Sequence, residues 1–153
     1  MKKIIIMISA FSLLTCILYS MKVYAAGDLT KQEAIQVNVQ LGDEKNSLRF
    51  YPSSLEFETG KLYKLVLKNR SRVKHYFSSD GLSRSVFTRK IQVLGKDGKT
   101  IAEVKGNIRE IEVYPGGIAE WWFVPVKAGR ISDLKCTIKS HTEAGMVGKI
   151  IIK

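Results

Sequence analysis

The chain has 153 residues, of which 45% are hydrophobic and 25% charged, and its formal net charge is +11 at pH 7. This length suits a short leader followed by one domain that can bury a core without disulfide bonds. The positive charge favours acidic protein partners or anionic surfaces, or else forms a solvated basic exterior. No recognised nucleic-acid-binding motif accompanies the charge, so we expect no nucleic-acid partner.

The N-terminus has the pattern of an export signal. Lys2 and Lys3 precede a mostly apolar run, Ile4–Tyr19, and small or tolerated side chains surround a cleavage point after Ala25. A permanent membrane anchor is the alternative, but a span needs about 20 predominantly apolar residues. This run is shorter and contains serine and threonine. We therefore expect a signal peptide at residues 1–25, one domain at 26–153, a periplasmic or secreted location, and no stable membrane insertion after cleavage.

Short β-type segments separated by turn residues dominate the rest of the chain. Alternating or continuous apolar runs predict strands at Ala34–Leu41, Leu55–Glu58, Leu62–Leu67, Ile91–Leu94, Thr100–Val104, Ile108–Tyr114, Ala119–Val124 and Val147–Ile152. Asp97-Gly98 lies between two of these runs and predicts a hairpin. Trp121 and Trp122 are neighbours on one strand and face opposite sides, so we expect one in the core and the other at the surface or under a loop.

Helical periodicity is scarce. Asp28–Glu33 and Gly81–Lys90 are the two stretches that we expect to form a turn or two of helix. Many short strands with intervening turns are typical of an all-β protein. The expected fold is therefore an antiparallel β-sandwich of two sheets, and no internal repeat or linker divides it further.

Cys136 is the only cysteine that remains after removal of the leader. In an oxidising compartment a lone exposed thiol is open to oxidation and cross-linking unless it is buried or bound. Three roles therefore stay open for Cys136: an inert core residue, a metal ligand or a catalytic nucleophile.

Cys136, His141 and Met146 follow one another with four residues between each pair, directly before the last predicted strand. A thiolate, imidazoles and a weak axial thioether form the ligand set of a mononuclear blue-copper site. The second imidazole must come from His75, because the chain has only two histidines. These four residues predict a site for one copper ion per chain.

The spacing of this loop resembles that of the cupredoxin family, most closely auracyanin and rusticyanin, and the chain also resembles plastocyanin and azurin. Asn69 followed by His75-Tyr76-Phe77 is similar to the region of the family's first ligand. The resemblance covers about Ile35 to Lys153 and implies a cupredoxin-like Greek-key sandwich. It also implies that His75, Cys136 and His141 form the copper plane, with Met146 as the long axial ligand.

By the same resemblance the protein is a monomeric one-electron carrier that cycles between Cu(II) and Cu(I). Electrons would leave through His141, in an apolar patch to which Tyr76, Ala144 and Gly145 contribute. Basic residues flank the ligands in sequence and either guide an acidic redox partner protein or form a solvated rim. They are Arg70, Arg72, Lys74, Lys135 and Lys139.

Enzymatic alternatives fit the sequence less well, and we expect no catalytic residues. A cysteine hydrolase leaves the spacing to Met146 unexplained. Multicopper oxidases and copper nitrite reductases carry a histidine beside the ligand cysteine, whereas Lys135 and Thr137 flank Cys136. The binuclear site of cytochrome oxidase needs a second loop cysteine. Copper tolerance without electron transfer stays open as the alternative function. A third alternative is a sandwich that binds a partner without copper, which requires that the four candidate ligands do not come together in the fold.

Overall fold

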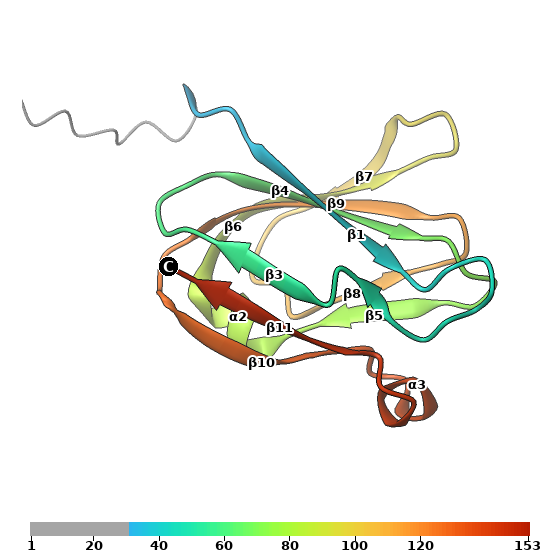
Figure 1. Cartoon of the computed structure of the whole chain (residues 1–153). Helices are drawn as coiled ribbons and strands as arrows, with labels where there is room; N and C mark the ends of the chain where they lie inside the picture. The colour runs from blue at the N-terminus through green and yellow to red at the C-terminus, as the bar shows by residue number, and fades with distance from the viewer. Residues whose placement is uncertain (1–30) are drawn as a thin grey trace, which may run out of the picture. The chain divides into compact units, whose positions relative to one another are not determined.

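The computed structural model describes residues 31–153, in which two β-sheets lie against each other with two short helices at their margins (Figure 1). The expected leader and the first half of the expected helical turn at Asp28–Glu33 lie outside this range, and in the described half Gln32 and Glu33 are not helical. None of the helices in the described range is long and apolar enough to cross a membrane.

One sheet has the strand order β2-β1-β4-β9-β6-β7 and the other has the order β3-β11-β10-β5-β8. The strands of the first sheet are β1 (Ile35–Leu41), β2 (Phe50–Tyr51), β4 (Tyr63–Asn69), β6 (Val86–Leu94), β7 (Thr100–Val104) and β9 (Ile118–Pro125). Those of the second are β3 (Ser54–Phe57), β5 (His75–Ser78), β8 (Glu110–Val113), β10 (Gly129–Lys135) and β11 (Val147–Ile152).

The all-β sandwich predicted from the sequence is confirmed, with one refinement in strand direction. Most neighbouring strands are antiparallel, but β1 runs parallel to β4 and β3 runs parallel to β11. Neither parallel pair consists of strands that follow one another in the chain. Each pair is therefore joined by a long crossover connection and not by a hairpin.

Alternation of side chains explains why these segments form strands around one core. Along β4 the residues Tyr63, Leu65 and Leu67 are buried, while Lys64 and Lys68 point to the other face. Aromatic rings fill much of the space between the sheets in edge-to-face pairs, which their charge distribution favours. The hydrophobic effect on this apolar area is the main force that holds the sheets together.

The tryptophan pair confirms the expected division between the two faces of β9. Trp121 is 1% exposed and belongs to the core. Trp122 lies on the outer face, where the ammonium groups of Lys64 and Lys90 lie 5.5 and 5.2 Å from its ring centre. These cation–π contacts cover an aromatic surface that would otherwise face water.

The expected helix at Gly81–Lys90 is correct only in its first half. Helix α2 spans Asp80–Ser85, and the Ser79 hydroxyl caps it by accepting a hydrogen bond from the Leu82 N–H. The following residues, expected to be helical, instead begin β6 and pair with β9 along most of its length. Tertiary pairing with a buried strand overrides the weak local helical preference.

Two connections meet at one end of the sandwich and position the candidate site. The β4–β5 connection leads into His75, the first residue of β5. The β10–β11 connection contains Cys136 and the short helix α3 (Lys139–Glu143), visible beside the ends of β10 and β11 in Figure 1. Pairing of Lys135 with Ser78 places β10 next to β5.

Candidate metal centre

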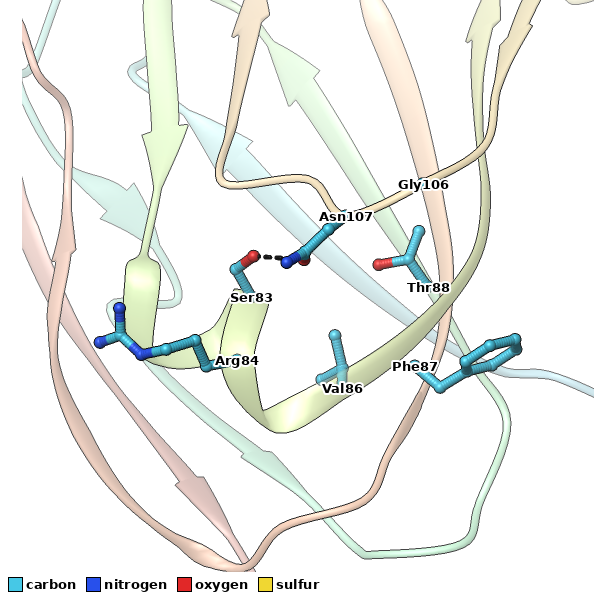
Figure 2. Close-up of a pocket in the computed structure, with 7 residues that line it drawn as sticks. All are labelled: Ser83, Arg84, Val86, Phe87, Thr88, Gly106 and Asn107. Atoms are coloured by element: carbon cyan, nitrogen blue, oxygen red, sulfur yellow. Dashed lines mark hydrogen bonds between the residues drawn. The ribbon is translucent and has the colours of Figure 1, made fainter.

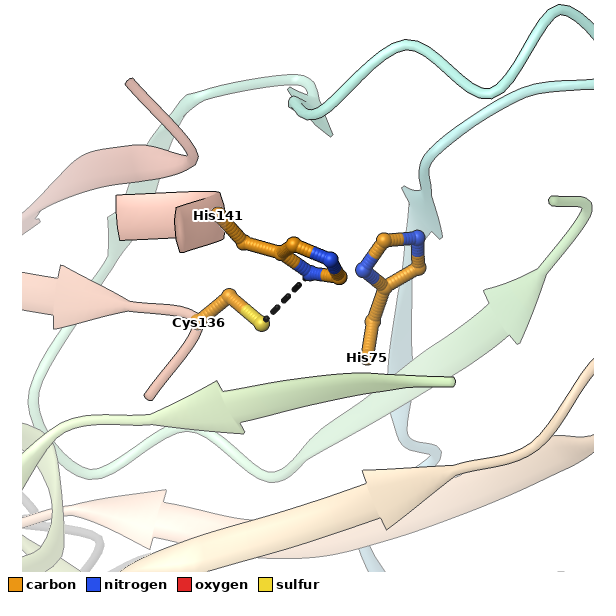
Figure 3. A group of neighbouring side chains, drawn as sticks. All are labelled: His75, Cys136 and His141. Carbon is orange, nitrogen blue, oxygen red and sulfur yellow. Dashed lines mark hydrogen bonds between the residues drawn. The ribbon is translucent and has the colours of Figure 1, made fainter. Parts of the chain in front are cut away.

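Three of the four residues selected from the sequence converge on one point. One ligand atom from each of His75, Cys136 and His141 lies within 4.8 Å of the others. The Cys136 Sγ lies 3.5 Å from the His141 Nδ1, and the two imidazole ring centres are 5.0 Å apart. Figure 3 shows both rings and the sulfur facing a common space. One sulfur and two imidazole nitrogens at these separations suit a single soft metal ion.

The ligand loop is folded by its own backbone hydrogen bonds. The Ile138 carbonyl accepts from the His141 and Thr142 N–H groups, which makes one turn of α3 and brings His141 back toward Cys136. The Thr142 hydroxyl donates to the Cys136 carbonyl. Cys136 and His141 therefore lie close together although four residues separate them in sequence.

Met146 is completely buried and its backbone is tied to both other residues of the loop. Its N–H donates to the His141 carbonyl over 2.9 Å, and its carbonyl accepts from the Cys136 N–H over 3.0 Å. Gly145 precedes Met146 and has a φ of +90°, a backbone conformation that residues other than glycine rarely adopt. These contacts fix the Met146 backbone beside Cys136 and His141, and axial ligation by its sulfur stays a prediction.

Cys136 is buried, and it is the one free cysteine among the described residues. The Tyr76 N–H points at its sulfur with a separation of 3.4 Å. A backbone donor aimed at sulfur stabilises negative charge there. Of the three roles left open by the sequence, a donor aimed at the sulfur beside two imidazoles favours a metal ligand over an inert core residue.

His75 supplies the test of whether these residues fit a metal ion. Its Nε2 lies 2.8 Å from the Ser71 Oγ, whereas its Nδ1 is buried without any hydrogen-bond partner in the described part of the chain. A buried polar atom without a partner is costly and demands an explanation. Because this nitrogen faces the sulfur and the second imidazole, an ion at that point would explain it, and the donor set fits.

Burial controls the charge of both imidazoles. It lowers the pKa of His75 from 6.5 to about 4, and the nearby His141 contributes in the same direction. Burial also lowers the pKa of His141. Both rings are therefore neutral at pH 7, which is the state that a metal ligand requires.

The rim near His141 combines apolar and charged groups, where the sequence led us to expect an apolar patch. Ala144 is exposed, but the Arg49 guanidinium donates to its carbonyl and lies against Gly145. Tyr76 is half-buried and its hydroxyl donates to Glu112. Arg49 lies far from the loop in sequence, and nothing in the pattern indicated its role.

The basic residues near the ligands are partly neutralised. Arg70 pairs with Glu44, Lys74 with Glu112, and Lys139 with Glu143, all at the surface. Exposed pairs of this kind contribute little to stability. Arg72 and Lys135 form no ion pair among residues 31–153, so they carry most of the unneutralised charge of this set.

A shallow pocket beside α2 shares no residue with the candidate centre. Ser83 donates a hydrogen bond of 2.7 Å to the Asn107 side chain there, and the Phe87 ring is 58% exposed (Figure 2). The residues that line the pocket are Ser83, Arg84, Val86, Phe87, Thr88, Gly106 and Asn107. They offer neither a nucleophile with a base nor a metal-ligand cluster.

Comparison with known proteins finds no matching family model but finds relatives. The chain is 27% identical over 143 residues to "Copper-resistant cuproprotein CopI" of Rubrivivax gelatinosus, covering 83% of this chain and 71% of that protein. It is 28% identical over 130 residues to "Plastocyanin B, chloroplastic" of Populus nigra, covering 84% of this chain and 66% of that protein.

Solved structures show the same fold at lower identity. A multicopper oxidase from Campylobacter jejuni superposes with a TM-score of 0.55 and 16% identity, over 80% of this chain and 31% of that one. The chain thus spans about a third of that oxidase. The sandwich, the convergence of His75, Cys136 and His141, and the two sequence relatives together support assignment of the chain to the cupredoxin family.

Proposed function

We propose that the protein binds one copper ion per chain through His75 Nδ1, Cys136 Sγ and His141 Nδ1, with Met146 as a weak axial ligand. The observation that carries this proposal is the buried Nδ1 of His75, which lacks a partner and faces the other two ligand atoms. The names of the two sequence relatives, a cuproprotein and a plastocyanin, support copper as the ion.

The principal function that we propose is one-electron transfer. Copper bound to such a ligand set alternates between Cu(II) and Cu(I). The protein holds the ligands in one arrangement, because two are completely buried and the third sits on a hydrogen-bonded turn. A ligand set that stays in place in both states keeps the reorganisation on electron transfer small. His141 is the most exposed of the three and provides the path to a partner.

Copper tolerance is the second candidate function. The relative from Rubrivivax gelatinosus is named as copper-resistant, and the same ligands would serve to sequester copper. The methionine content favours electron transfer, because Met146 is the only methionine after the expected leader. Storage or delivery of soft copper commonly uses several exchangeable thioether and imidazole ligands.

We propose no enzymatic activity. The chain has two histidines, and the proposed site uses both, so no second copper centre can form from imidazoles of this chain. The similar multicopper oxidase is about three times longer than the matched region and shares the fold alone.

In the cell we propose an exported monomer, periplasmic or secreted, that starts near Ala26 and meets an acidic redox partner. The unpaired charges of Arg72 and Lys135 beside the site would steer such a partner. N-terminal sequencing of the mature protein tests the cleavage point, and salt dependence of the electron-transfer rate tests the steering.

The direct test is a titration of the purified mature protein with Cu(II), followed by absorption spectroscopy. We expect an intense visible thiolate-to-copper band that saturates at one copper per chain and is bleached by ascorbate. Cys136→Ser should abolish the band. Met146→Leu keeps the volume and both strong ligand types, so the band should persist while the reduction potential rises. Copper bound without a visible band would refute the proposed ligands.

A second experiment separates the two functions. A strain that lacks the protein should lose respiratory or photosynthetic electron flux if the protein is a carrier, and the purified protein should exchange electrons rapidly with cytochromes. Normal flux together with increased sensitivity to copper would assign the protein to copper tolerance.

A further inference from the structure

The Ser71 hydroxyl lies at the centre of a buried hydrogen-bond network behind His75. Its Oγ is 2.8 Å from the His75 Nε2, 2.9 Å from the Asn69 Oδ1 and 2.8 Å from the Val73 carbonyl oxygen. The Val73 N–H approaches the same oxygen at 3.3 Å. Ser71 is 4% exposed, and Asn69 and His75 are fully buried, so water does not compete for these contacts.

The orientation of the Asn69 amide follows from its own partners. Its Nδ2 lies 2.8 Å from two carbonyl oxygens, those of Val73 and Val113, and its Oδ1 lies 2.9 Å from the Ser71 N–H. If the Asn69 amide were flipped, its oxygen would face the two carbonyl oxygens and its NH₂ group would face the Ser71 N–H, so that all three contacts would be unfavourable. Oδ1 is therefore the atom that faces the Ser71 hydroxyl, and it can only accept.

A count of protons then fixes the role of Ser71. A hydroxyl has one proton to donate and can accept two hydrogen bonds. The Asn69 Oδ1 and the Val73 carbonyl oxygen are both pure acceptors, so the proton of Ser71 goes to one of them. If it went to His75 instead, Oγ would face two oxygens at 2.9 and 2.8 Å with no proton between them. Ser71 must therefore accept a hydrogen bond from His75, which requires a proton on Nε2.

The other imidazole nitrogen leads to the same assignment. A proton on Nδ1 would be a buried donor without an acceptor, which costs the full desolvation of that N–H group. With the proton on Nε2, Nδ1 carries a free electron pair directed at the space that Cys136 and His141 share.

Gly42 closes the network from the other side. A Cβ at this position would lie 2.8 Å from the His75 Nε2 and 2.9 Å from the Ser71 Cβ, and the Gly42 φ is +64°. Only a residue without a side chain allows the backbone to approach so closely. The ring is thus confined between Gly42, Ser71 and the site.

We propose that Ser71 is a positioning residue that fixes the tautomer and orientation of His75, so that Nδ1 is presented unprotonated to the metal before the metal arrives. This inference rests on the proposed function for its purpose, but the tautomer itself is a property of the metal-free protein. Its signal in the sequence is the pair Asn69 and Ser71, two short polar residues at a strand end, followed by a histidine.

The first test uses the metal-free wild-type protein and therefore does not depend on a variant that folds. Nitrogen-15 NMR of the imidazoles above pH 7 should show His75 as a single tautomer, protonated at Nε2, with a slowly exchanging Nε2–H. A proton on Nδ1, or a mixture of both tautomers, would overturn the proposal.

The second test compares Ser71→Ala with Ser83→Ala, another buried serine whose hydroxyl bonds to an asparagine side chain, away from the site. Ser71→Ala should give mixed tautomers for His75 and a copper affinity reduced by about 10–100-fold. Ser83→Ala should change neither. A single Nε2–H tautomer and unchanged affinity in Ser71→Ala would overturn the proposal. Wild-type protein with the expected tautomer but no copper binding would refute the proposed function alone.

Discussion

Acidification should destabilise the metal-free protein through His75. Burial lowers the pKa of His75 to about 4 from its ordinary value of 6.5, so the unfolded chain binds this proton more tightly than the folded chain does. Between these two values the unfolded state carries more protons, and stability falls as the pH falls. From this difference we expect a loss of about 2 kcal/mol by pH 5 and about 3 kcal/mol by pH 4.

The assay is urea unfolding of the chelator-treated protein at pH 7.5, 6, 5 and 4. His75→Gln is the matched control, because it removes this titration and leaves the smaller contribution of His141. Surface carboxyl groups whose pKa the fold lowers, such as Glu112, also lose stability as the pH falls, but both proteins keep them, so they cancel in the comparison. A slope between pH 7.5 and 5 that is equal in wild type and His75→Gln would refute the reasoning.

Three further substitutions test the packing around the site and the fold. Gly42→Ala should cost about 1–3 kcal/mol more than Gly98→Ala in urea unfolding, because both have positive φ but only the first places a Cβ against the His75 imidazole. Ser79→Ala removes the cap of α2 and should cost about 1 kcal/mol in the same assay, with no effect on copper affinity. Leu65→Ala leaves a cavity at a fully buried position and should cost about 2–5 kcal/mol.

Where alternation or turn chemistry was strong, the sequence predicted the strands well. The strand Thr100–Val104 and the strand Val147–Ile152 have the predicted bounds, and the turn at Asp97-Gly98 lies between β6 and β7 as expected. Gly98 has a φ of +76°, which is the conformation that an Asp-Gly hairpin favours.

Three strands were missed because their residues look like loops when taken alone: the two-residue β2, and the longer β5 and β10. In β10, Gly129–Lys135, only Leu134 is buried, and its pairing with β11 is interrupted by a register shift. The strand β5 has four residues and follows a run of charged side chains. Both strands form because their neighbours in the sheet supply hydrogen-bond partners, and this information is not local.

At the candidate centre, the residue types and their spacing were enough to select His75, Cys136 and His141, which the structure brings together. The spacing could not show which nitrogen of His75 faces the site. That depends on the Ser71 hydroxyl and on the backbone of Gly42, and the latter comes from a different connection of the fold. The contact of Arg49 with the ligand loop is equally non-local.

The hydrogen bond from the Tyr76 N–H to the Cys136 sulfur joins positions that are 60 residues apart in sequence. The loop between Cys136 and Met146 can offer a thiolate, an imidazole and a thioether by itself, but the second imidazole arrives only when β5 docks beside β10. Bringing His75 next to this loop closes a long segment of chain, and that closure costs conformational entropy. Binding of the ion to an unfolded chain cannot offset this cost, so the sandwich must fold first. We therefore expect strong copper binding only from the folded sandwich. Copper should in turn raise the free energy of unfolding in proportion to the logarithm of its free concentration. Loading of this protein with copper would then follow folding of the chain.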